Sequence, residues 1–290
     1  MPSADVTPLV EPLANGIPKM RPTVTVAPSD EPRPWPEICA ILRRKVADFV
    51  AASPDRDRHD DDVLRSTRAR TRESLAVVSE ALQRYGPTEL SLSYNGGKDC
   101  LVLLILILAS LPDPAEPVHA HDLATVRPSK PVPPLQAIYI APPDPFPEVE
   151  DFVVTTTAQY HLNLTRYALP MRAALEAYRR DRPSVTAIFM GTRRTDPHSE
   201  FLTPFSPTDK DWPQFMRVNP VLDWHYTEIW TFIRSLDIPF CSLYNRGFTS
   251  LGGTRNTRPN PALALNGDAT TFRPAYELVR DDEERLGRDR

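Results

Sequence analysis

The stretch LSLSYNGGKDCLVLLILILASL, residues 90–111, interrupts an apolar run with a short polar loop. The pattern ELSLSY, residues 89–94, predicts a strand, and residues 99–110 are so uniformly apolar that they predict a buried helix. Two glycines between a strand and a helix let backbone N–H groups converge on one point, and the helix N-terminus adds partial positive charge. With Lys98 beside them, the loop is expected to bind an anion, most plausibly phosphate or pyrophosphate.

Strands and helices alternate along most of the chain. Two amphipathic helices precede the quoted stretch, at 37–51 and 63–85. Later strands are predicted at 136–141, 163–167 and 187–190, and later helices at 146–160, 171–180 and 227–236. This alternation predicts an α/β fold, a Rossmann-like three-layer α/β/α arrangement with a mostly parallel sheet. Ligands of such sheets bind beyond the carboxyl ends of the strands, so the loops after Tyr94, Ala141 and Met190 are expected along one rim.

Composition limits the classes of function. The 290 residues carry 34 Lys+Arg and 38 Asp+Glu, and this lack of a basic excess argues against a nucleic-acid partner. Three cysteines without zinc-ligand spacing argue against a structural metal site and a disulfide scaffold. The apolar run 101–111 is too short to span a bilayer. A cytoplasmic protein without a membrane partner is expected, with a monomer as the default.

Proline marks the expected domain boundaries, because 33 prolines gather in a few stretches. Residues 1–36 are predicted to be a disordered Pro-rich tail, with neither signal-peptide nor transit-peptide features. Residues 37–290 are predicted to form one catalytic domain. Within it, 112–134 is expected to be a Pro-rich surface insertion and 281–290 a C-terminal tail that contains arginines.

The glycine loop differs from the common nucleotide motifs. It is not the GxxxxGK[ST] loop, because Asp99 follows Lys98, and it is not GxGxxG. A tight strand-to-helix turn with Asp99 as N-cap explains the residues about as well as an anion site does. Asp99 could instead approach a magnesium ion that bridges phosphates. The residues alone leave these alternatives open.

A second polar segment follows the strand predicted at 187–190. Arg193 and Arg194 stand on the same predicted rim as the glycine loop, where forked hydrogen bonds could neutralise phosphate oxygens. A solvated arginine pair is the plainer interpretation. Farther on, Asp209 and Trp212 would suit a flavin, since a carboxylate accepts from the ring N3–H and an aromatic side chain covers the ring. A turn with a core tryptophan is the alternative there.

Three motifs in order carry a family resemblance. SYNGGKDC, residues 93–100, resembles the pyrophosphate-binding loop of the adenine-nucleotide α-hydrolase group, and its Asn and Cys resemble those of eukaryotic, fungal-type FAD synthases (FMN adenylyltransferases). Residues 188–233 are similar to the flavin-binding region of that family. Residues 244–261 resemble its YxxGYTSLG…NTxPNP segment, with Phe248 in place of the usual Tyr. The similarity spans roughly 88–288.

The resemblance implies transfer of AMP from MgATP to the phosphate of FMN, which gives FAD and pyrophosphate without a covalent enzyme intermediate. The expected catalytic residues are Asn95, Asp99, Arg285 and Arg288, with Asp99 also near the Mg²⁺ and the two arginines reaching back from the C-terminal tail. The residues expected to bind ATP and its phosphates are Ser93, Tyr94, Gly96, Gly97, Lys98, Tyr139, Ile140, Gly191, Arg193 and Arg194. The residues expected to bind FMN are Thr192, Asp196, Asp209, Trp212 and Arg217.

Three other functions fit the same fold. A phosphoadenylylsulfate reductase-like oxidoreductase would need a reactive C-terminal cysteine, but Cys241 lies in the apolar context IPFCSLY and is expected to be a core thiol. A tRNA-thiolating ligase would need paired cysteines or a basic RNA surface, and neither is evident. A non-catalytic flavin or nucleotide carrier is disfavoured by the presence of Asn95, Lys98 and Asp99 together.

Overall fold

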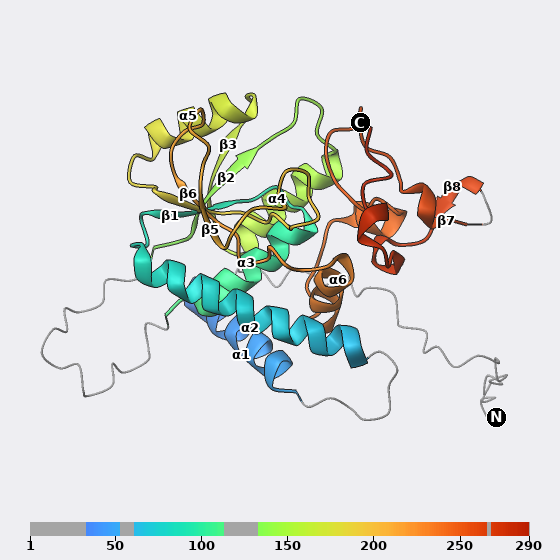
Figure 1. The fold of residues 1–290 in the computed structure, drawn as a ribbon, viewed down its shortest axis with the longest axis horizontal. Coiled ribbons are helices and arrows are strands. Elements are labelled where there is room, and N and C mark those ends of the chain that lie inside the picture. The colour runs from blue at the N-terminus through green and yellow to red at the C-terminus, as the bar shows by residue number, and fades with distance from the viewer. Residues whose placement is uncertain (1–32, 53–60, 113–132, 266–267, 290) are drawn as a thin grey trace, which may run out of the picture. The chain divides into compact units, whose positions relative to one another are not determined.

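The computed structural model describes residues 33–52, 61–112, 133–265 and 268–289, all within one compact unit, Arg33–Arg290 (Figure 1). Most of the predicted tail and nearly all of the predicted insertion lie outside the described residues. At the tail boundary the prediction was two residues too long, because helix α1 begins at Trp35. Pro36 is compatible with that start, because proline lacks a backbone N–H and an N–H in the first helical turn has no partner within the helix.

The sheet has six strands in the order β3-β2-β1-β4-β6-β5. All neighbouring pairs are parallel except β5–β6, which confirms the predicted mostly parallel sheet. The four predicted strands are β1 (Leu90–Ser93), β2 (Gln136–Ile140), β3 (Asn163–Tyr167) and β4 (Ala187–Phe189). The strands β5 (Phe205–Pro207) and β6 (Met216–Val218) were not predicted, because they lie in a segment interrupted by prolines and polar residues that shows no run typical of a strand.

Helices cover both faces of this sheet, as the three-layer prediction requires. The helix α5 (Met171–Asp181) packs on one face, against Ile138 and Ile188. The other face carries the large core formed with the remaining helices, and Figure 1 shows α1 and α2 on the side of the sheet opposite α5. These helices are α1 (Trp35–Ala51), α2 (Asp61–Arg84), α3 (Lys98–Ser110), α4 (Pro147–Gln159) and α6 (Tyr226–Ser235).

The apolar composition of α3 is explained by its position. The helices α1, α2 and α6 all contact it, and residues 101–108 have no exposed surface. A helix that is apolar all round is stable only when it is enclosed in this way. The prediction of a buried helix after the glycine loop is therefore confirmed.

The C-terminal region adds short elements beside the sheet: the 3-10 turns η2 (Ser242–Arg246), η3 (Pro261–Leu263), η4 (Ala275–Glu277) and η5 (Asp281–Glu283), and the hairpin of β7 (Ala264–Leu265) and β8 (Asp268–Phe272). The last residues are paired to the chain rather than frayed, since Arg258 N donates to Gly287 O at 2.8 Å and Asp289 N donates to Asn256 O at 3.1 Å. In the part of the chain that the structure describes, no helix combines the length and apolarity needed to cross a membrane.

Candidate active site

The glycine loop joins β1 to α3 in a conformation that requires glycine. Gly96 has φ +72°, in the left-handed region, and a Cβ there would lie 3.0 Å from the Val153 side chain of α4. The side chain of Asn95 closes the turn, because its Oδ1 accepts from Gly97 N at 2.9 Å. The helix begins at Lys98 with Gly97 as its N-cap, so Asp99 lies in the first turn and is not the N-cap.

A polar pocket of about 220 Å³ lies beside this loop at the carboxyl ends of β1 and β4. It brings together the loop, the segment after β4 and the C-terminal arginines. The predicted site residues that line it are Asn95, Gly97, Lys98, Asp99, Gly191, Asp196, Arg285 and Arg288, and the others are Cys100, Tyr244, Ser250, Leu251 and Glu284. Residues almost 200 positions apart in sequence therefore share one cavity, as the parallel sheet predicted.

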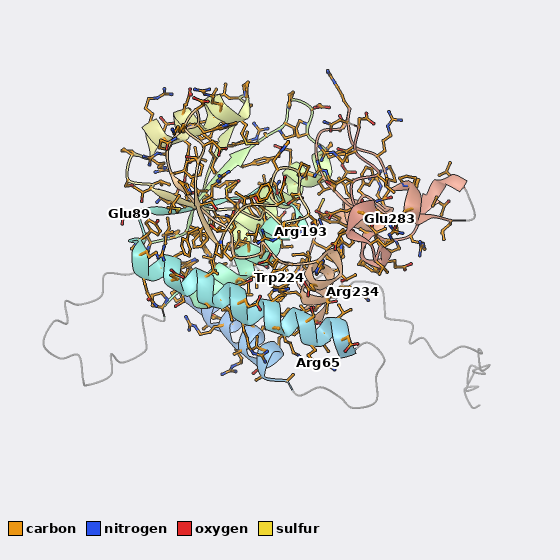
Figure 2. The ribbon with its side chains drawn as sticks, viewed as in Figure 1. Arg65, Glu89, Arg193, Trp224, Arg234 and Glu283 are labelled. Atoms are coloured by element: carbon orange, nitrogen blue, oxygen red, sulfur yellow. The ribbon has the colours of Figure 1, made fainter. Side chains whose placement is uncertain are left out.

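Four charged side chains form an ion-pair cluster at this pocket: Lys98, Arg193 and Glu284, which are buried, and Asp99, which is partly exposed. Lys98 Nζ lies 2.5 Å from Glu284 Oε1 and 3.0 Å from Asp99 Oδ2, and Arg193 lies 2.8 Å from Asp99 Oδ1 and also pairs with Glu284. Arg193, labelled near the middle of the view in Figure 2, is fully buried. We call these four residues the charge cluster.

The charges in the cluster cancel. Burial works against the charged form of Lys98, but Asp99 and Glu284 raise its pKa above the usual value. Burial also works against ionisation of Asp99, yet Arg193 and Lys98 hold the pKa of that carboxyl below its usual value. Within these four side chains two cations face two carboxylates, so Lys98 does not supply the free positive charge that the sequence predicted for it. Outside the cluster, the partly exposed Asp281 lies 3.6 Å from Arg193 and also pairs with His225.

Two arginines of the C-terminal segment remain to attract an anion. Arg285 is exposed and lines the polar pocket, and Arg288 donates from Nη1 to Leu251 O at 2.9 Å. Burial and the neighbouring Arg285 lower the pKa of Arg288, and its buried Nε has no hydrogen-bond partner among the described residues. Two nearby guanidinium groups that are short of negative charge are well suited to phosphate.

A second, apolar pocket of about 570 Å³ adjoins the first at the ends of β2 and β3. Tyr139 and Ile140 line it, as predicted, and Asn95 and Leu251 line both pockets. The other lining residues are mostly apolar: Ala141, Pro142, Pro143, Pro145, Phe146, Val149, Ala168, Leu169, Pro170, Met171 and Gly252. A flat apolar group would fit here, directly beside the polar pocket.

Five of the predicted ATP-binding residues line neither pocket: Ser93, Tyr94, Gly96, Arg193 and Arg194. Tyr94 is fully buried, its hydroxyl donates to Thr156 Oγ1 at 2.8 Å and its N–H donates to Ile138 O, so both of its donors are used within the core. Arg194 is exposed and lies 2.6 Å from Asp223 Oδ1, while its guanidinium also donates to two carbonyl groups of the loop after it. We therefore assign Tyr94 to the core and Arg194 to the anchoring of that loop.

The residues predicted to bind FMN fall into two groups. Thr192 and Asp196 follow β4 at the rim, and Asp196 lines the polar pocket. Asp209 and Trp212 lie in the loop that precedes β6, at the opposite, amino-terminal edge of the sheet, because β6 runs parallel to β4. Arg217 lies within β6, where it is the neighbour of Ile188 across the sheet, and Ile188 packs on the face that α5 covers. The Arg217 guanidinium donates to Pro207 O at 2.8 Å.

Two residues of the site were missed by sequence reasoning. Glu284 lies within the acidic run DDEE, and no local signal separates it from its neighbours. Tyr244 was part of a recognised motif, but nothing in the motif showed that its hydroxyl would accept from Lys98 N at 2.8 Å and so hold the start of α3. Ser93 ends β1 and, like Thr192, lines neither of the two pockets.

Comparisons with known proteins agree with this geometry. The family model of the phosphoadenosine phosphosulfate reductase domain matches residues 89–183 and 166–259. A probable FAD synthase of Schizosaccharomyces pombe is 41% identical over 216 residues, which span 74% of this chain and 77% of that protein. Among solved structures, Candida glabrata FMN adenylyltransferase in complex with FAD and inorganic pyrophosphate is 27% identical with a TM-score of 0.75, over 88% of this chain and 97% of that one. Yeast FAD synthetase in complex with FAD is 30% identical with a TM-score of 0.75, over 88% and 99% of the two chains. The chain therefore belongs to the FAD synthase family, within the phosphoadenosine phosphosulfate reductase domain fold.

Proposed function

We propose that this protein is an FMN adenylyltransferase, which transfers AMP from MgATP to the phosphate of FMN and releases pyrophosphate. The observation that carries the proposal is the pair of adjoining pockets, one apolar and one polar, the latter with two arginines that form no ion pair among the described residues. A nucleoside triphosphate needs both environments side by side. The structural relative from Candida glabrata, bound to FAD and pyrophosphate, supports the same assignment.

The two pockets divide the ATP molecule between them. The adenine fits the apolar pocket near Tyr139 and Ile140, and the β- and γ-phosphates fit the polar pocket at Gly97 and the N-terminus of α3. The α-phosphate joins these parts of ATP, and Asn95 lines both pockets. We therefore expect Asn95 to donate a hydrogen bond to the phosphate that is attacked.

The reaction joins two anions, so offsetting charge is the main catalytic task. An oxygen of the FMN phosphate attacks the α-phosphorus, the bond to the β-phosphate oxygen breaks, and pyrophosphate leaves. Arg285 and Arg288 stabilise the charge on the transferring group from the open side of the polar pocket. No protein nucleophile is needed, and burial raises the pKa of the Cys100 thiol to about 12, so this neighbour of the loop stays protonated.

The flavin would extend from the rim toward Asp209. A strand of three residues is about 10 Å long, so β6 separates the two groups of FMN residues by a distance that one FMN molecule can bridge. In this arrangement Thr192 and Asp196 serve the phosphate end, and Asp209, Trp212 and Arg217 serve the ring. The Asp209 carboxylate is largely exposed and lies 3.8 Å from an Arg217 nitrogen, so it remains open to a ring N–H.

Magnesium fits this site as an ion carried by ATP. Within the described residues, no three His, Cys, Asp or Glu side chains are grouped to hold a metal on their own. Magnesium usually takes one or two carboxylates together with phosphate and water oxygens, and Asp99 and Asp196 line the pocket for that role. When bound, the ion would withdraw negative charge from the phosphates of ATP.

The oxidoreductase alternative receives no support from the cysteines. Cys241 is buried, its Sγ lies 3.6 Å from Glu148 O, and burial raises its pKa. A thiol held in that way is a poor nucleophile. Cys39, Cys100 and Cys241 are all free, which is consistent with the reducing cytoplasm that we propose as the location, and we propose a monomer as the working form.

The test is an incubation of the purified protein with FMN, ATP and magnesium in which FAD and pyrophosphate are measured together. Equal amounts of both products, with neither formed when FMN is omitted, are expected. Consumption of ATP without FAD would point to another acceptor. Absence of ATP consumption would leave a binding protein.

A further inference from the structure

Glu284 is the point at which three distant segments meet. Its carboxylate is 7% exposed, with one oxygen 2.5 Å from Lys98 of the glycine loop and the other paired with Arg193 after β4. Neither partner lies near it in sequence. The side chain therefore fastens the C-terminal segment to both of the loops that form the polar pocket.

The backbone of Glu284 is fixed as well. Its carbonyl accepts from Thr249 Oγ1 at 2.6 Å, and its N–H donates to Asp281 O at 3.1 Å. The next residue, Arg285, directs its exposed side chain to the polar pocket. A shift of Glu284 would therefore move Arg285 and, three residues later, Arg288.

We propose that Glu284 is a positioning residue, which holds Arg285 and Arg288 against the transferring phosphate by pairing with Lys98 and Arg193. The inference rests on the proposed function. Glu284 itself contributes no net charge to the pocket, because the charge cluster is balanced. Through Glu284, Arg285 and Arg288 reach their correct positions only when the glycine loop has folded and Lys98 is in place.

This role predicts a particular kinetic pattern for Glu284→Gln. Glutamine keeps the volume and one acceptor, but it leaves Lys98 and Arg193 to share the carboxylate of Asp99, with Asp281 farther from Arg193 at 3.6 Å. Glu284 lines the polar pocket but not the apolar pocket, where the adenine is expected, and the substitution does not alter the backbone N–H groups at Gly97. The loss should therefore appear in kcat, by about 100-fold, the scale of a catalytic group displaced by an ångström, with a much smaller change in the KM for ATP.

The experiment compares Glu284→Gln with Glu283→Gln, each alone and combined with Arg285→Ala, by steady-state kinetics and thermal unfolding. Glu283 is the matched control, because its carboxylate lies outside the charge cluster and is 3.7 Å from the Arg280 guanidinium. Arg285→Ala should cost far less in the Glu284→Gln background than in the wild type, while its effect should be unchanged by Glu283→Gln. Such non-additivity indicates that the two residues act as a unit, whereas a general loss of stability would leave the two effects additive.

A second variant applies if Glu284→Gln does not fold. Thr249→Val removes the hydroxyl that donates to the Glu284 carbonyl and leaves every charge in place. It should also lower kcat and weaken the effect of Arg285→Ala. Normal kcat in both variants, or additive effects in the cycle, would overturn the inference. A wild-type protein that forms no FAD would instead contradict the proposed function, so the two failures are distinguishable.

Discussion

The buried arginine Arg193 offers the sharpest test of the charge cluster. Its guanidinium is 1% exposed and faces three carboxylates: Asp99 at 2.8 Å, Asp281 at 3.6 Å and Glu284. Arg193→Met would leave Lys98 alone to balance Asp99 and Glu284 in the interior. The substitution therefore creates one uncompensated buried negative charge in place of a neutral cluster.

The size of the effect follows from that imbalance. Removing one partner of a buried ion pair typically costs about 3–5 kcal/mol, out of a total stability of about 5–15 kcal/mol. For a unit of this size, each kcal/mol moves Tm by roughly 2–4 °C. Arg193→Met should therefore lower Tm by about 6–20 °C.

The matched control is the adjacent arginine. Arg194→Met removes an exposed guanidinium that pairs with Asp223 at the surface, where ion pairs contribute little. Thermal unfolding followed by circular dichroism, with both variants in the same buffer, gives the comparison directly. Equal Tm shifts for the two variants, or no shift for Arg193→Met, would refute the reasoning.

Four further predictions follow from the site. Asn95→Ala should fold with a Tm close to the wild type and lose turnover, and normal kcat in that variant would remove Asn95 from the mechanism. Asp209→Ala should weaken FMN binding far more than ATP binding in titration calorimetry, and equal losses would contradict the flavin assignment. The pKa of Asp99 in the folded protein lies below its ordinary value of 3.8. Its ionised form therefore stabilises the fold fully above pH 3.8, and this stabilisation is lost as the pH falls through the folded pKa. Asp99→Asn should accordingly make the free energy of unfolding less dependent on pH below pH 3.8. Removal of 285–290, which keeps Glu284, should abolish most FAD synthesis with only a modest loss of Tm, and unchanged kinetics would exclude the C-terminal arginines.

The truncation point matters because the structure changes the expectation for the C-terminal segment. If 281–290 were only a tail that carries arginines, its loss would reduce activity without unfolding the chain. In the structure, Asp281 accepts from Tyr226 N at 2.6 Å at the start of α6, and Glu284 is part of the charge cluster. Removal of these two residues should therefore destabilise the fold, since it exposes a helix end and leaves Lys98 and Arg193 with only the Asp99 carboxylate between them.

The sequence by itself determined the order of elements and the position of the anion site. Short apolar or alternating runs and amphipathic or fully apolar helices leave recognisable patterns, so β1 to β4 and α1 to α6 could be placed in advance. The glycine loop is a local structure, because the positive φ of Gly96 and the start of α3 depend on adjacent residues. The parallel sheet then implied that the glycine loop and the segment after β4 would share a rim, as the polar pocket confirms.

Only the tertiary structure decided which charged residues are buried and which partners they pair with. Arg193 and Arg194 are neighbours of the same type, yet one is buried in a neutral cluster and the other is held at the surface. Asp209 follows a rim segment in sequence but lies at the opposite edge of the sheet, because β6 runs parallel to β4. Glu284 forms an ion pair with Lys98, which lies 186 positions away in the sequence. Such pairings depend on burial and on contacts between distant segments, and these quantities exist only once the chain has folded.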